Sequence, residues 1–339
     1  MATIDDVARH AGVARSTVSY VLSHKRRISP ATREQVERSI AILGYQPNAR
    51  ARALASKRTN ALALVAPLRT DNNVPVIMQF VASVAIAARA RDHDLLLMTE
   101  EEGEAGVRRI SQTSLVDAVI VMDVETDDQR LPMLRSFGLP CVLIGRPDEP
   151  RGLACVDLDF NQAAALCVDH LADLGHRDLC MLGSGPEVYR RRSSFAMAFC
   201  AGFEAAVARR GISGRWHSTE GGYEKIYSLV ECELREHPQT TAFVVHNEAL
   251  LPAVLSALRR QGRQVPEDVS IVAICPEEMA LAQSVELTAV AVPAEQIGRT
   301  AVDMVLRLLE SNEGSEVRLI APQLVVRAST SPPPARCPV

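Results

Sequence analysis

The sequence predicts an α/β protein in which a small helical domain precedes two doubly wound parallel-sheet subdomains. Its first 46 residues hold three short amphipathic helical patterns, with a glycine turn between the first two. From residue 61 onward, apolar runs typical of buried strands alternate with helical patterns. A basic N-terminal segment is joined to an acidic remainder. We therefore expect a three-helix helix-turn-helix domain (1–46), a hinge helix or linker (47–58) and a two-part core (59–330).

The first two helices are predicted over residues 3–11 and 14–22. Thr3 can cap the first helix, and apolar side chains recur along it at helical spacing. In the second helix, Val18, Val21 and Leu22 predict the buried face. The polar side chains then point outward and can bond to base edges or phosphates in a major groove. They are Arg15, Ser16, Thr17, Ser19 and Tyr20.

A third helix is predicted to begin after Ser29, a favourable N-cap, and to end at Gly44. Three short helices with a tight turn between the first two are typical of a helix-turn-helix domain. Any two helices separated by a glycine can mimic this pattern, so the charge distribution matters.

The N-terminal segment is strongly basic. Residues 1–58 contain eleven Lys and Arg residues against four acidic residues. The other 281 residues contain 26 basic and 37 acidic residues, which gives the whole chain its net charge of −4. A basic head on an acidic body is the electrostatic pattern of a polyanion binder, here double-stranded DNA.

These N-terminal motifs resemble the head of the LacI/GalR family of bacterial transcription regulators. The matching stretches are 3–8, 11–13, 17–19, Leu22, 32–33, 43–48 and 53–54. The resemblance implies that Arg15 and Ser16 reach bases, whereas Thr17 and Ser19 contact phosphates. Further contacts that it implies come from Thr3, Lys25, Arg27, Ser29 and Thr32. The family often has an arginine at the position of Tyr20, so operator preference can differ there.

Residues 47–58 admit two interpretations. By composition they form a flexible basic linker, because isolated helices in water need roughly 12–15 residues. The resemblance implies a hinge helix that folds in the minor groove beside the hinge of a second copy. Asn48 and Ala51 would contact DNA there, and Leu54 would insert between base pairs and bend the duplex.

The core is predicted to contain two sheets, because its alternation of strands and helices is too long for one ordinary sheet. The first series holds strands at 61–67, 94–99, 117–123, 140–145 and 154–159, with helices at 76–90, 103–115 and 127–137. The second holds helices at 160–174, 195–210, 223–236 and 248–261, with strands at 178–183, 241–247 and 269–275. A strand at 287–293, a helix at 294–309 and an extended segment at 316–327 return the chain between the sheets.

The resemblance implies an architecture of periplasmic-binding-protein type, with three crossovers joining the halves. The expected N-subdomain spans about 59–159 and 290–317, and the C-subdomain about 160–289 and 318–330. A proline-rich tail, 331–339, is expected to be frayed.

A ligand cleft is expected between the subdomains, because open α/β sheets bind ligands beyond the carboxyl ends of their strands. The candidate effector-binding residues are Asn72, Asp123, Arg146, Arg191, Phe199, Asn247 and Cys275. Other polar groups of the same loops are Asp71, Asn73, Arg190, Arg192, His246 and Glu248.

Phe199 and Cys275 mark departures from the family. Many family sugar sensors have an arginine and an aspartate at these two positions, whereas Asn247 matches the family's Asn-Asp motif. Three explanations remain open. A sugar can be bound by other groups, with Phe199 stacked on its ring; the effector can be less polar; or both residues belong to the core and the site has lost its ligand.

Several functional classes find no support. The enzyme motifs Gly-x-Gly-x-x-Gly, Gly-x-x-x-x-Gly-Lys-Ser/Thr and Gly-x-Ser-x-Gly do not occur, so we expect no catalytic residues and no enzyme. The eight cysteines form no Cys-x-x-Cys pair, and the histidines lack metal-ligand spacing. We therefore expect reduced thiols, no metal and no cofactor. With neither a transmembrane run nor a leader, a cytoplasmic, nucleoid-associated protein with no membrane partner is expected.

The resemblance implies an allosteric repressor that binds a palindromic operator as a homodimer. A small-molecule effector, a sugar or glycoside in this family, would release it from DNA. A ligand-independent or co-repressor-dependent DNA binder of the same fold is the alternative.

Overall fold

The computed structural model describes residues 2–23, 26–45, 58–69, 73–99, 108–109, 115–136, 138–219, 222–311 and 315–334. The chain folds as two units, Met1–Asn60 and Ala61–Val339, which we call the head and the core. The hinge predicted at 47–58 and the helix predicted at 103–115 fall almost wholly outside the described residues. No helix within these ranges is long and apolar enough to cross a membrane.

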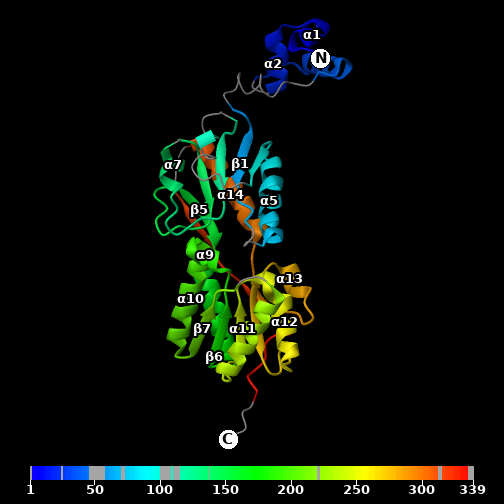
Figure 1. Cartoon of the computed structure of the whole chain (residues 1–339). Helices are drawn as coiled ribbons and strands as arrows, with labels where there is room; N and C mark the ends of the chain where they lie inside the picture. Colours follow the sequence, from blue (N-terminus) through cyan, green and yellow to red (C-terminus); the bar gives the residue numbers. More distant parts are fainter. Residues whose placement is uncertain are drawn as a thin grey trace. The chain divides into compact units, whose positions relative to one another are not determined.

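The head contains helices α1 (Ile4–His10), α2 (Arg15–Ser23) and α3 (Pro30–Leu43) (Figure 1). Thr3 and Asp6 form a complete capping box at the start of α1, with the Thr3 amide donating to the Asp6 carboxylate at 2.9 Å. Ser29 caps α3, and Gly44 ends it in the left-handed conformation (φ 58°). Local sequence signals therefore set both ends of the longest head helix.

The three head helices share a small apolar core. The buried side chains are Val7, Ala8, Ala11, Val18, Val21 and Val36. His10 Nδ1 donates to Ser39 Oγ at 3.0 Å, and this hydroxyl donates to the carbonyl of Gln35, so α1 is also fastened to α3 by a polar link. The outward face of α2 is left free of packing.

The first sheet of the core has the strand order β11-β5-β4-β3-β1-β2, with every pair parallel. Its strands are β1 (Ala61–Val65), β2 (Asp94–Met98), β3 (Ala118–Val121), β4 (Cys141–Ile144), β5 (Ala154–Leu158) and β11 (Val317–Ile320). Helices α5 (Val74–Arg89) and α14 (Ala294–Ser311) cover one face, and α7 (Leu131–Ser136) lies on the other (Figure 1). We call this sheet with its helices the N-lobe.

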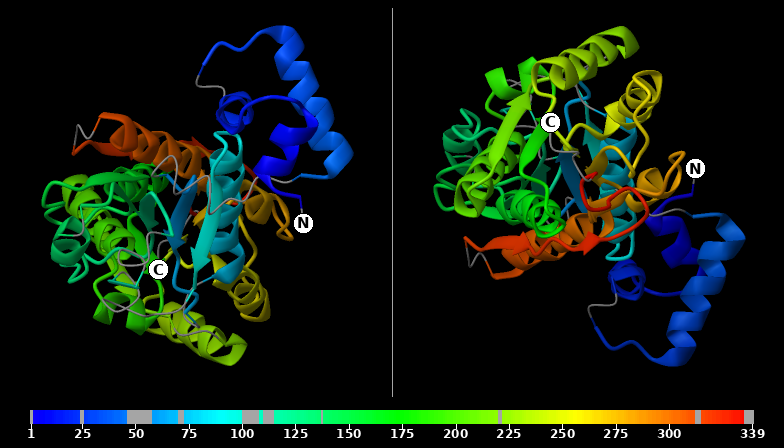
Figure 2. Two further views of the ribbon diagram at one scale, coloured as in Figure 1. Left: turned by 90° about the horizontal axis from the view of Figure 1, so that it is seen from above. Right: turned by 90° about the horizontal axis from the view of Figure 1, so that it is seen from below.

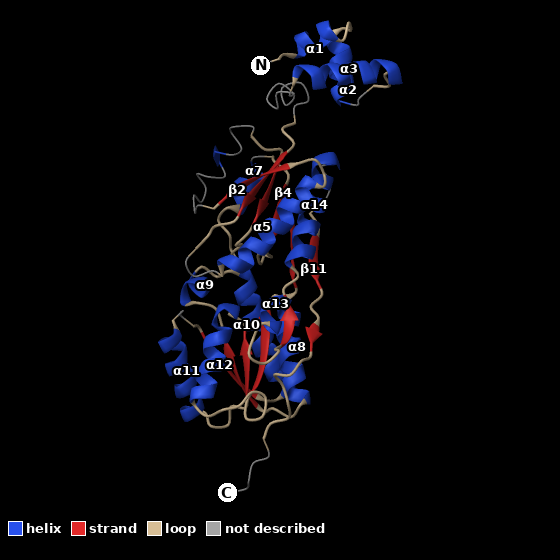
Figure 3. Ribbon diagram, turned by 90° about the vertical axis from the view of Figure 1, so that its right-hand side faces the viewer, coloured by secondary structure: helices blue, strands red, loops and turns tan. Residues whose placement is uncertain are grey.

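The second sheet has the order β12-β10-β9-β8-β6-β7, in which only β12 is antiparallel to its neighbour. Its strands are β6 (Asp178–Leu182), β7 (Ser213–His217), β8 (Ala242–Val245), β9 (Ser270–Cys275), β10 (Thr288–Ala291) and β12 (Leu324–Val325). Helices α8 (Phe160–Asp173) and α10 (Ser194–Arg210) cover one face, and α11 (Tyr223–Glu236) and α12 (Leu251–Arg260) cover the other (Figure 3). This is the C-lobe.

Short elements join these strands to the space between the lobes. They are α9 (Pro186–Arg190), the 3₁₀ helix η1 (Glu248–Leu250) and α13 (Glu277–Leu281). The chain passes between the lobes three times: from β5 to α8, from β10 to α14 and from β11 to β12. Figure 2 shows the ribbon from above and from below, with helix α14 in orange at one edge of the core in both views.

The lobe borders differ slightly from those expected. β10 ends in the C-lobe at Ala291, and β11 keeps the chain in the N-lobe to Ile320 rather than to about 317. The extended segment predicted at 316–327 is thus two strands in two sheets, separated at Pro322, which has no amide hydrogen for a strand ladder.

Ser331, the first residue of the tail expected to be frayed, is bonded to the C-lobe, whereas residues 335–339 lie outside the described residues. Its amide donates to Ser270 Oγ at 3.0 Å, and its hydroxyl donates to the carbonyl of Pro266 at 2.9 Å. Its carbonyl accepts from the buried His176 ring at 2.9 Å. The last described residues therefore satisfy buried polar groups of the C-lobe.

Two glycines allow close helix contacts in the core. A Cβ on Gly202 of α10 would lie 2.5 Å from the backbone oxygen and 2.7 Å from the Cα of Asn161 in α8. A Cβ on Gly298 of α14 would overlap Ser83 of α5, whose hydroxyl donates to the carbonyl of Glu295 at 2.9 Å. Both pairs of helices approach too closely for a larger residue.

A buried ion-pair network lies at the β7 edge of the C-lobe. The Glu233 carboxylate accepts from Arg215 at 2.9 Å, from His217 at 3.0 Å and from Thr240 at 3.0 Å. Burial alone raises the pKa of Glu233, but the hydrogen bonds from His217, Arg215 and Thr240 outweigh it and hold this pKa at about 2. The potential metal-ligand atoms of Cys180, His217 and Glu233 lie within 4.8 Å of one another. The Arg215 guanidinium, however, already supplies the positive charge that a metal ion would bring.

Candidate functional site

The outward face of α2 carries the polar side chains that the sequence predicts to face DNA. Arg15, Ser16 and Ser19 are exposed, Thr17 and Tyr20 are half-buried, and Val18 between them is fully buried. The Arg15 guanidinium is 69% exposed and only 3.7 Å from the Asp5 carboxylate. A weak surface ion pair of this kind leaves the guanidinium able to reach a partner outside the protein.

Other predicted DNA-contact residues of the head hold its local structure. Thr3 caps α1, and Ser29 Oγ accepts from the amide of Thr32 at 3.2 Å. Arg27 is exposed, and the Arg26 guanidinium lies 5.6 Å from the centre of the Tyr20 ring, which lies on α2. Lys25, Asn48, Ala51 and Leu54 lie outside the described residues.

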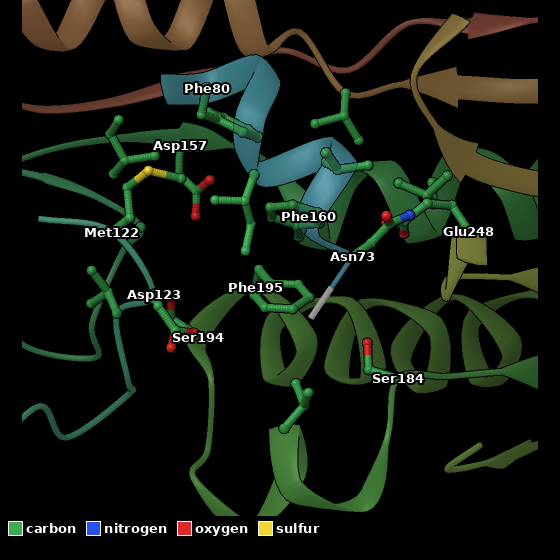
Figure 4. Close-up of a pocket in the computed structure, with 18 of the residues that line it drawn as sticks. Asn73, Phe80, Met122, Asp123, Asp157, Phe160, Ser184, Ser194, Phe195 and Glu248 are labelled. Atoms are coloured by element: carbon green, nitrogen blue, oxygen red, sulfur yellow. The ribbon is translucent and has the colours of Figure 1, made fainter. Parts of the chain in front are cut away.

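A cavity of about 170 Å³ lies in the core where the strand ends of the two lobes face each other (Figure 4). Its volume is close to the ~150 Å³ of an apolar cavity that accepts one benzene ring. Elements of both lobes line it. The lining residues are Ala66, Pro67, Asn73, Val76, Ile77, Phe80, Met122, Asp123, Val124, Ile144, Gly145, Asp157, Phe160, Ser184, Val188, Ser194, Phe195, His246, Asn247, Glu248, Ile274 and Val292.

Aromatic rings form the C-lobe wall of this cavity. The rings of Phe160 and Phe195 lie 5.7 Å apart, at the starts of α8 and α10. The His246 ring lies 6.1 Å from Phe160 and 5.7 Å from Phe195. Phe199, one helical turn after Phe195, stacks on His246 from behind at 4.2 Å. The wall is therefore aromatic, and Phe199 sets the plane of its imidazole.

One carboxylate of the cavity is paired with arginines of both lobes. Asp123 follows β3 and lies 3.0 Å from the Arg69 guanidinium and 4.0 Å from that of Arg191. All three side chains are at most 15% exposed. This cluster neutralises Asp123 and joins Arg191 of the C-lobe to the N-lobe.

Two further acids of the cavity have no such cation among the described residues that line it. Asp157 is 8% exposed, and its carboxylate accepts from the amide of Leu158 at 2.9 Å. Burial raises its pKa to about 7. Burial also raises the pKa of Glu248, although the Asn73 side chain donates a hydrogen bond to this carboxylate. Figure 4 shows Asn73 and Glu248 together on one side, with Asp157 on another.

His246 lines the cavity and is deeply buried. One of its ring nitrogens has no hydrogen-bond partner among the described residues. His246 is 3% exposed, and the nitrogen without a partner is Nδ1. Burial lowers its pKa to about 3, so the imidazole is neutral. A neutral imidazole offers one donor and one acceptor, and an unpaired buried group of this kind carries a free-energy cost.

Beside the cavity, residues 124–126 of the N-lobe run antiparallel to residues 192–194 of the C-lobe. Glu125 and Ser193 form the bridge, and the Thr126 amide donates to the carbonyl of Arg192 at 2.8 Å. The Arg192 side chain in turn donates a hydrogen bond to Thr126 Oγ1 at 2.9 Å. This interlobe clasp joins the lobes independently of the three crossovers.

The predicted effector residues do not all lie in one place. Asp123 and Asn247 line the cavity, and Arg191 lies behind Asp123. Arg146 is exposed and lines a neighbouring cavity instead. Phe199 and Cys275 are fully buried and do not line the cavity. Asn72 lies outside the described residues.

Sequence reasoning missed most of the apolar wall. It did not select Phe80, Phe160, Phe195 or Asp157, and it named His246 only as one polar group among several. A usable signal was present, because Asp157 and Phe160 flank the first crossover, where the chain must pass the cleft. Phe195 lies at the start of the helix that carries Phe199.

Comparison with known proteins shows the same organisation. The family profile "Bacterial regulatory proteins, lacI family" matches residues 3–48, and "Periplasmic binding protein-like domain" matches residues 168–330. The HTH-type transcriptional regulator CelR of Thermobifida fusca is 30% identical over an alignment of 342 positions, which covers 96% of this chain and 98% of that protein. The HTH-type transcriptional repressor PurR of Aliivibrio fischeri (strain MJ11) is 28% identical, covering 97% and 98%.

Solved structures agree in fold. A complex of the transcriptional regulator CelR with cellobiose has a TM-score of 0.67 at 28% identity and covers 97% of this chain and 100% of that one. The lac repressor dimer bound to operator and the anti-inducer ONPF has a TM-score of 0.82 at 24% identity and covers 97% and 99%. The likeness extends over the head and the core of the chain alike.

Proposed function

Because the chain belongs to the lacI family of bacterial regulatory proteins, we propose that it represses transcription as a homodimer on a palindromic operator and leaves the DNA when a small molecule fills its cleft. It is a regulator and not an enzyme. One observation carries the proposal: a helix-turn-helix head with a polar outward face on α2 is joined to a two-lobed core that encloses a cavity. A protein of this kind acts at the nucleoid.

The head supports direct reading of bases. Arg15 begins α2, where a recognition helix enters the major groove with its N-terminal residues foremost. A bidentate arginine–guanine contact is worth about 1–3 kcal/mol, so Arg15→Ala should weaken operator binding by roughly 5- to 150-fold. The operator is obtained by selecting bound duplexes from a random pool with the full chain. Arg263→Ala, at an exposed arginine of the core, is the matched control.

An inverted repeat among the selected duplexes supports the homodimer, and a single half-site contradicts it. The N-lobe offers a surface for self-association, because several large apolar side chains are exposed on α5 and the edge strand β2. They are Val74, Met78, Ile86, Leu96 and Leu97. A concentration-dependent dimer in analytical ultracentrifugation checks this assignment.

Leu54 is proposed to be the wedge of the hinge. Leu54→Ala should weaken operator binding several-fold or more, because an apolar side chain inserted between base pairs stabilises the bent duplex. The fluorescence of Trp216, the only tryptophan of the chain, should show an unchanged core. Equal affinity of the variant and the parent would remove the wedge role.

The effector is proposed to act by changing how the lobes sit on each other. Such couplings are typically about 1–3 kcal/mol, which suffices for regulation. A carbohydrate effector is favoured by the family and by the CelR complex with cellobiose. Operator binding is measured by fluorescence anisotropy with and without candidate sugars, cellobiose included. Tighter binding with ligand would make the molecule a co-repressor, and no change with any ligand would indicate a ligand-independent binder.

A further inference from the structure

We propose that the ligand of the cleft is a small organic cation, an ammonium group carried on a ring-sized body with an apolar face. The proposal rests on the function proposed above, in which this cavity is the effector site, and it names the chemistry of that effector. Three features of the cavity carry it: its uncompensated acids, its aromatic wall and its unpaired imidazole.

The charge of the lining is acidic. No lysine or arginine occurs among the described residues that line the cavity, whereas Asp123, Asp157 and Glu248 do. Arg69 and Arg191 neutralise Asp123 from outside the cavity. Asp157 accepts from a backbone amide and Glu248 from the neutral Asn73, so the described residues of the lining give neither acid a cationic partner.

Without a cation, the ionised forms of these two acids are disfavoured, because burial raises the pKa of both. Withdrawing a carboxylate from water is costly unless an opposite charge and hydrogen bonds replace the water. A sugar hydroxyl supplies a hydrogen bond and no charge. An ammonium supplies both, and hydrogen bonds with an ionised partner are about twice as strong as neutral ones.

The aromatic wall suits the rest of such a ligand. Phe160 and Phe195 lie between the Asp157 side and the Glu248 side of the cavity (Figure 4). Ring faces attract a cation within about 6 Å, and they also cover the apolar face of a ring. The cavity of about 170 Å³ matches a single-ring body.

His246 gives the observation that is independent of charge. Its ring lines the cavity and is 97% buried, and its Nδ1 atom has no hydrogen-bond partner among the described residues, while Phe199 stacked behind it fixes its plane. In the tautomer that carries its proton on Nε2, Nδ1 is an acceptor, and it then fits a ligand that brings N–H groups. The neutral imidazole adds no positive charge that would repel a cation.

Two sources share this chemistry: amino sugars, in which the ammonium replaces a hydroxyl, and arylalkylamines. Matched pairs separate charge from shape. They are D-glucosamine with D-glucose, and 2-phenylethylamine with 2-phenylethanol. Isothermal titration calorimetry of the full chain at pH 7 gives the four affinities. We expect the amine to bind at least tenfold tighter than its neutral partner in one pair, and the pair that does so identifies the source.

Variants test whether the acids cause the preference. Glu248→Gln and Asp157→Asn each replace a carboxyl group that can ionise beside a bound ammonium by a neutral amide of the same shape, and each should reduce the preference to less than threefold. Glu278→Gln, at an exposed glutamate of α13, is the matched control and should leave it unchanged. Circular dichroism spectra confirm that each variant is folded.

The outcomes are distinct. Equal or tighter binding of the neutral partners, no amine binding up to millimolar concentration, or a preference that survives both acid variants would each overturn the inference. If cellobiose instead binds and releases the protein from its operator, the proposed function stands and the inference fails. If an amine binds as expected and operator affinity does not change, the inference stands and the proposed release mechanism fails.

Discussion

Replacing Gly202 by alanine should loosen the packing of α10 on α8. The added Cβ would lie 2.5 Å and 2.7 Å from backbone atoms of Asn161, and backbone atoms cannot rotate away as a side-chain end can. Overpacking typically costs about 1–3 kcal/mol, and we expect the upper end here. Alanine improves helix propensity by about 1 kcal/mol. The free energy of unfolding should therefore fall by about 2 kcal/mol.

The assay uses the only tryptophan of the chain. Trp216 lies on β7 with its ring 4.9 Å from that of Tyr189, so its fluorescence during urea unfolding reports on the C-lobe and not on the head. Ala201→Gly, at the exposed neighbouring position of the same helix, is the control. The Ala201→Gly variant should lose only helix propensity, so its free energy of unfolding should fall by about 1 kcal/mol. A Gly202→Ala protein more stable than the parent would refute the close approach of the two helices.

Three other predictions concern stability; the first, in the C-lobe, uses the same fluorescence, and the other two, in the N-lobe, use circular dichroism during urea unfolding. The pKa of Glu233 is held at about 2 in the folded state, so its ion pair with Arg215 stabilises the protein above about pH 4.5 and is lost as the pH falls towards 2. Glu233→Gln should therefore reduce the loss of stability at acid pH. An unchanged loss in the variant would contradict this prediction. Burial raises the pKa of Asp157 from 3.8 to about 7, so the folded state binds more protons than the unfolded state and stability falls between about pH 4 and 7. Without ligand, Asp157→Asn should therefore be more stable than the parent at pH 8 but not at pH 4. A difference in stability between variant and parent that does not change with pH would contradict this prediction. Gly298→Ala should destabilise the N-lobe, because the added Cβ overlaps Ser83. In a double-mutant cycle, Ser83→Gly should lower the free energy of unfolding less in the Gly298→Ala variant than in the parent. Strict additivity of the two changes would exclude the overlap.

The sequence predicts the head in detail because its signals are local. Thr3, Ser29 and Gly44 mark helix ends by the hydrogen bonds that they make within three residues, and no distant contact is needed to recognise them. The alternation of strands and helices predicts the two sheets for a similar reason. A buried parallel strand is apolar along nearly its whole length. The edge strand β7, Ser213–His217, is neither buried nor apolar, and it is not among the predicted strands.

The cavity is harder to predict, because it depends on which way side chains point at the ends of the elements. Phe195 and Phe199 lie one turn apart on the same helix, and only Phe195 reaches the cavity, whereas Phe199 packs behind His246. Similarly, Asp157 looks in the sequence like part of a strand, and only the position of β5 within the sheet places its carboxylate at the cleft. Such positions are set by tertiary packing and leave no local periodic signal.

The three passages between the lobes restrict how this protein can be divided or recombined. A truncation within 312–316 would remove β11 from one sheet and β12 from the other, so a single cut damages both lobes. Neither lobe is encoded by one continuous stretch, and exchange of one lobe between relatives would need several matched junctions. The boundary between Asn60 and Ala61 is different, because a single junction there separates two compact units of the chain. Grafting another head at this boundary would give a chimeric regulator with a new DNA target and the same ligand.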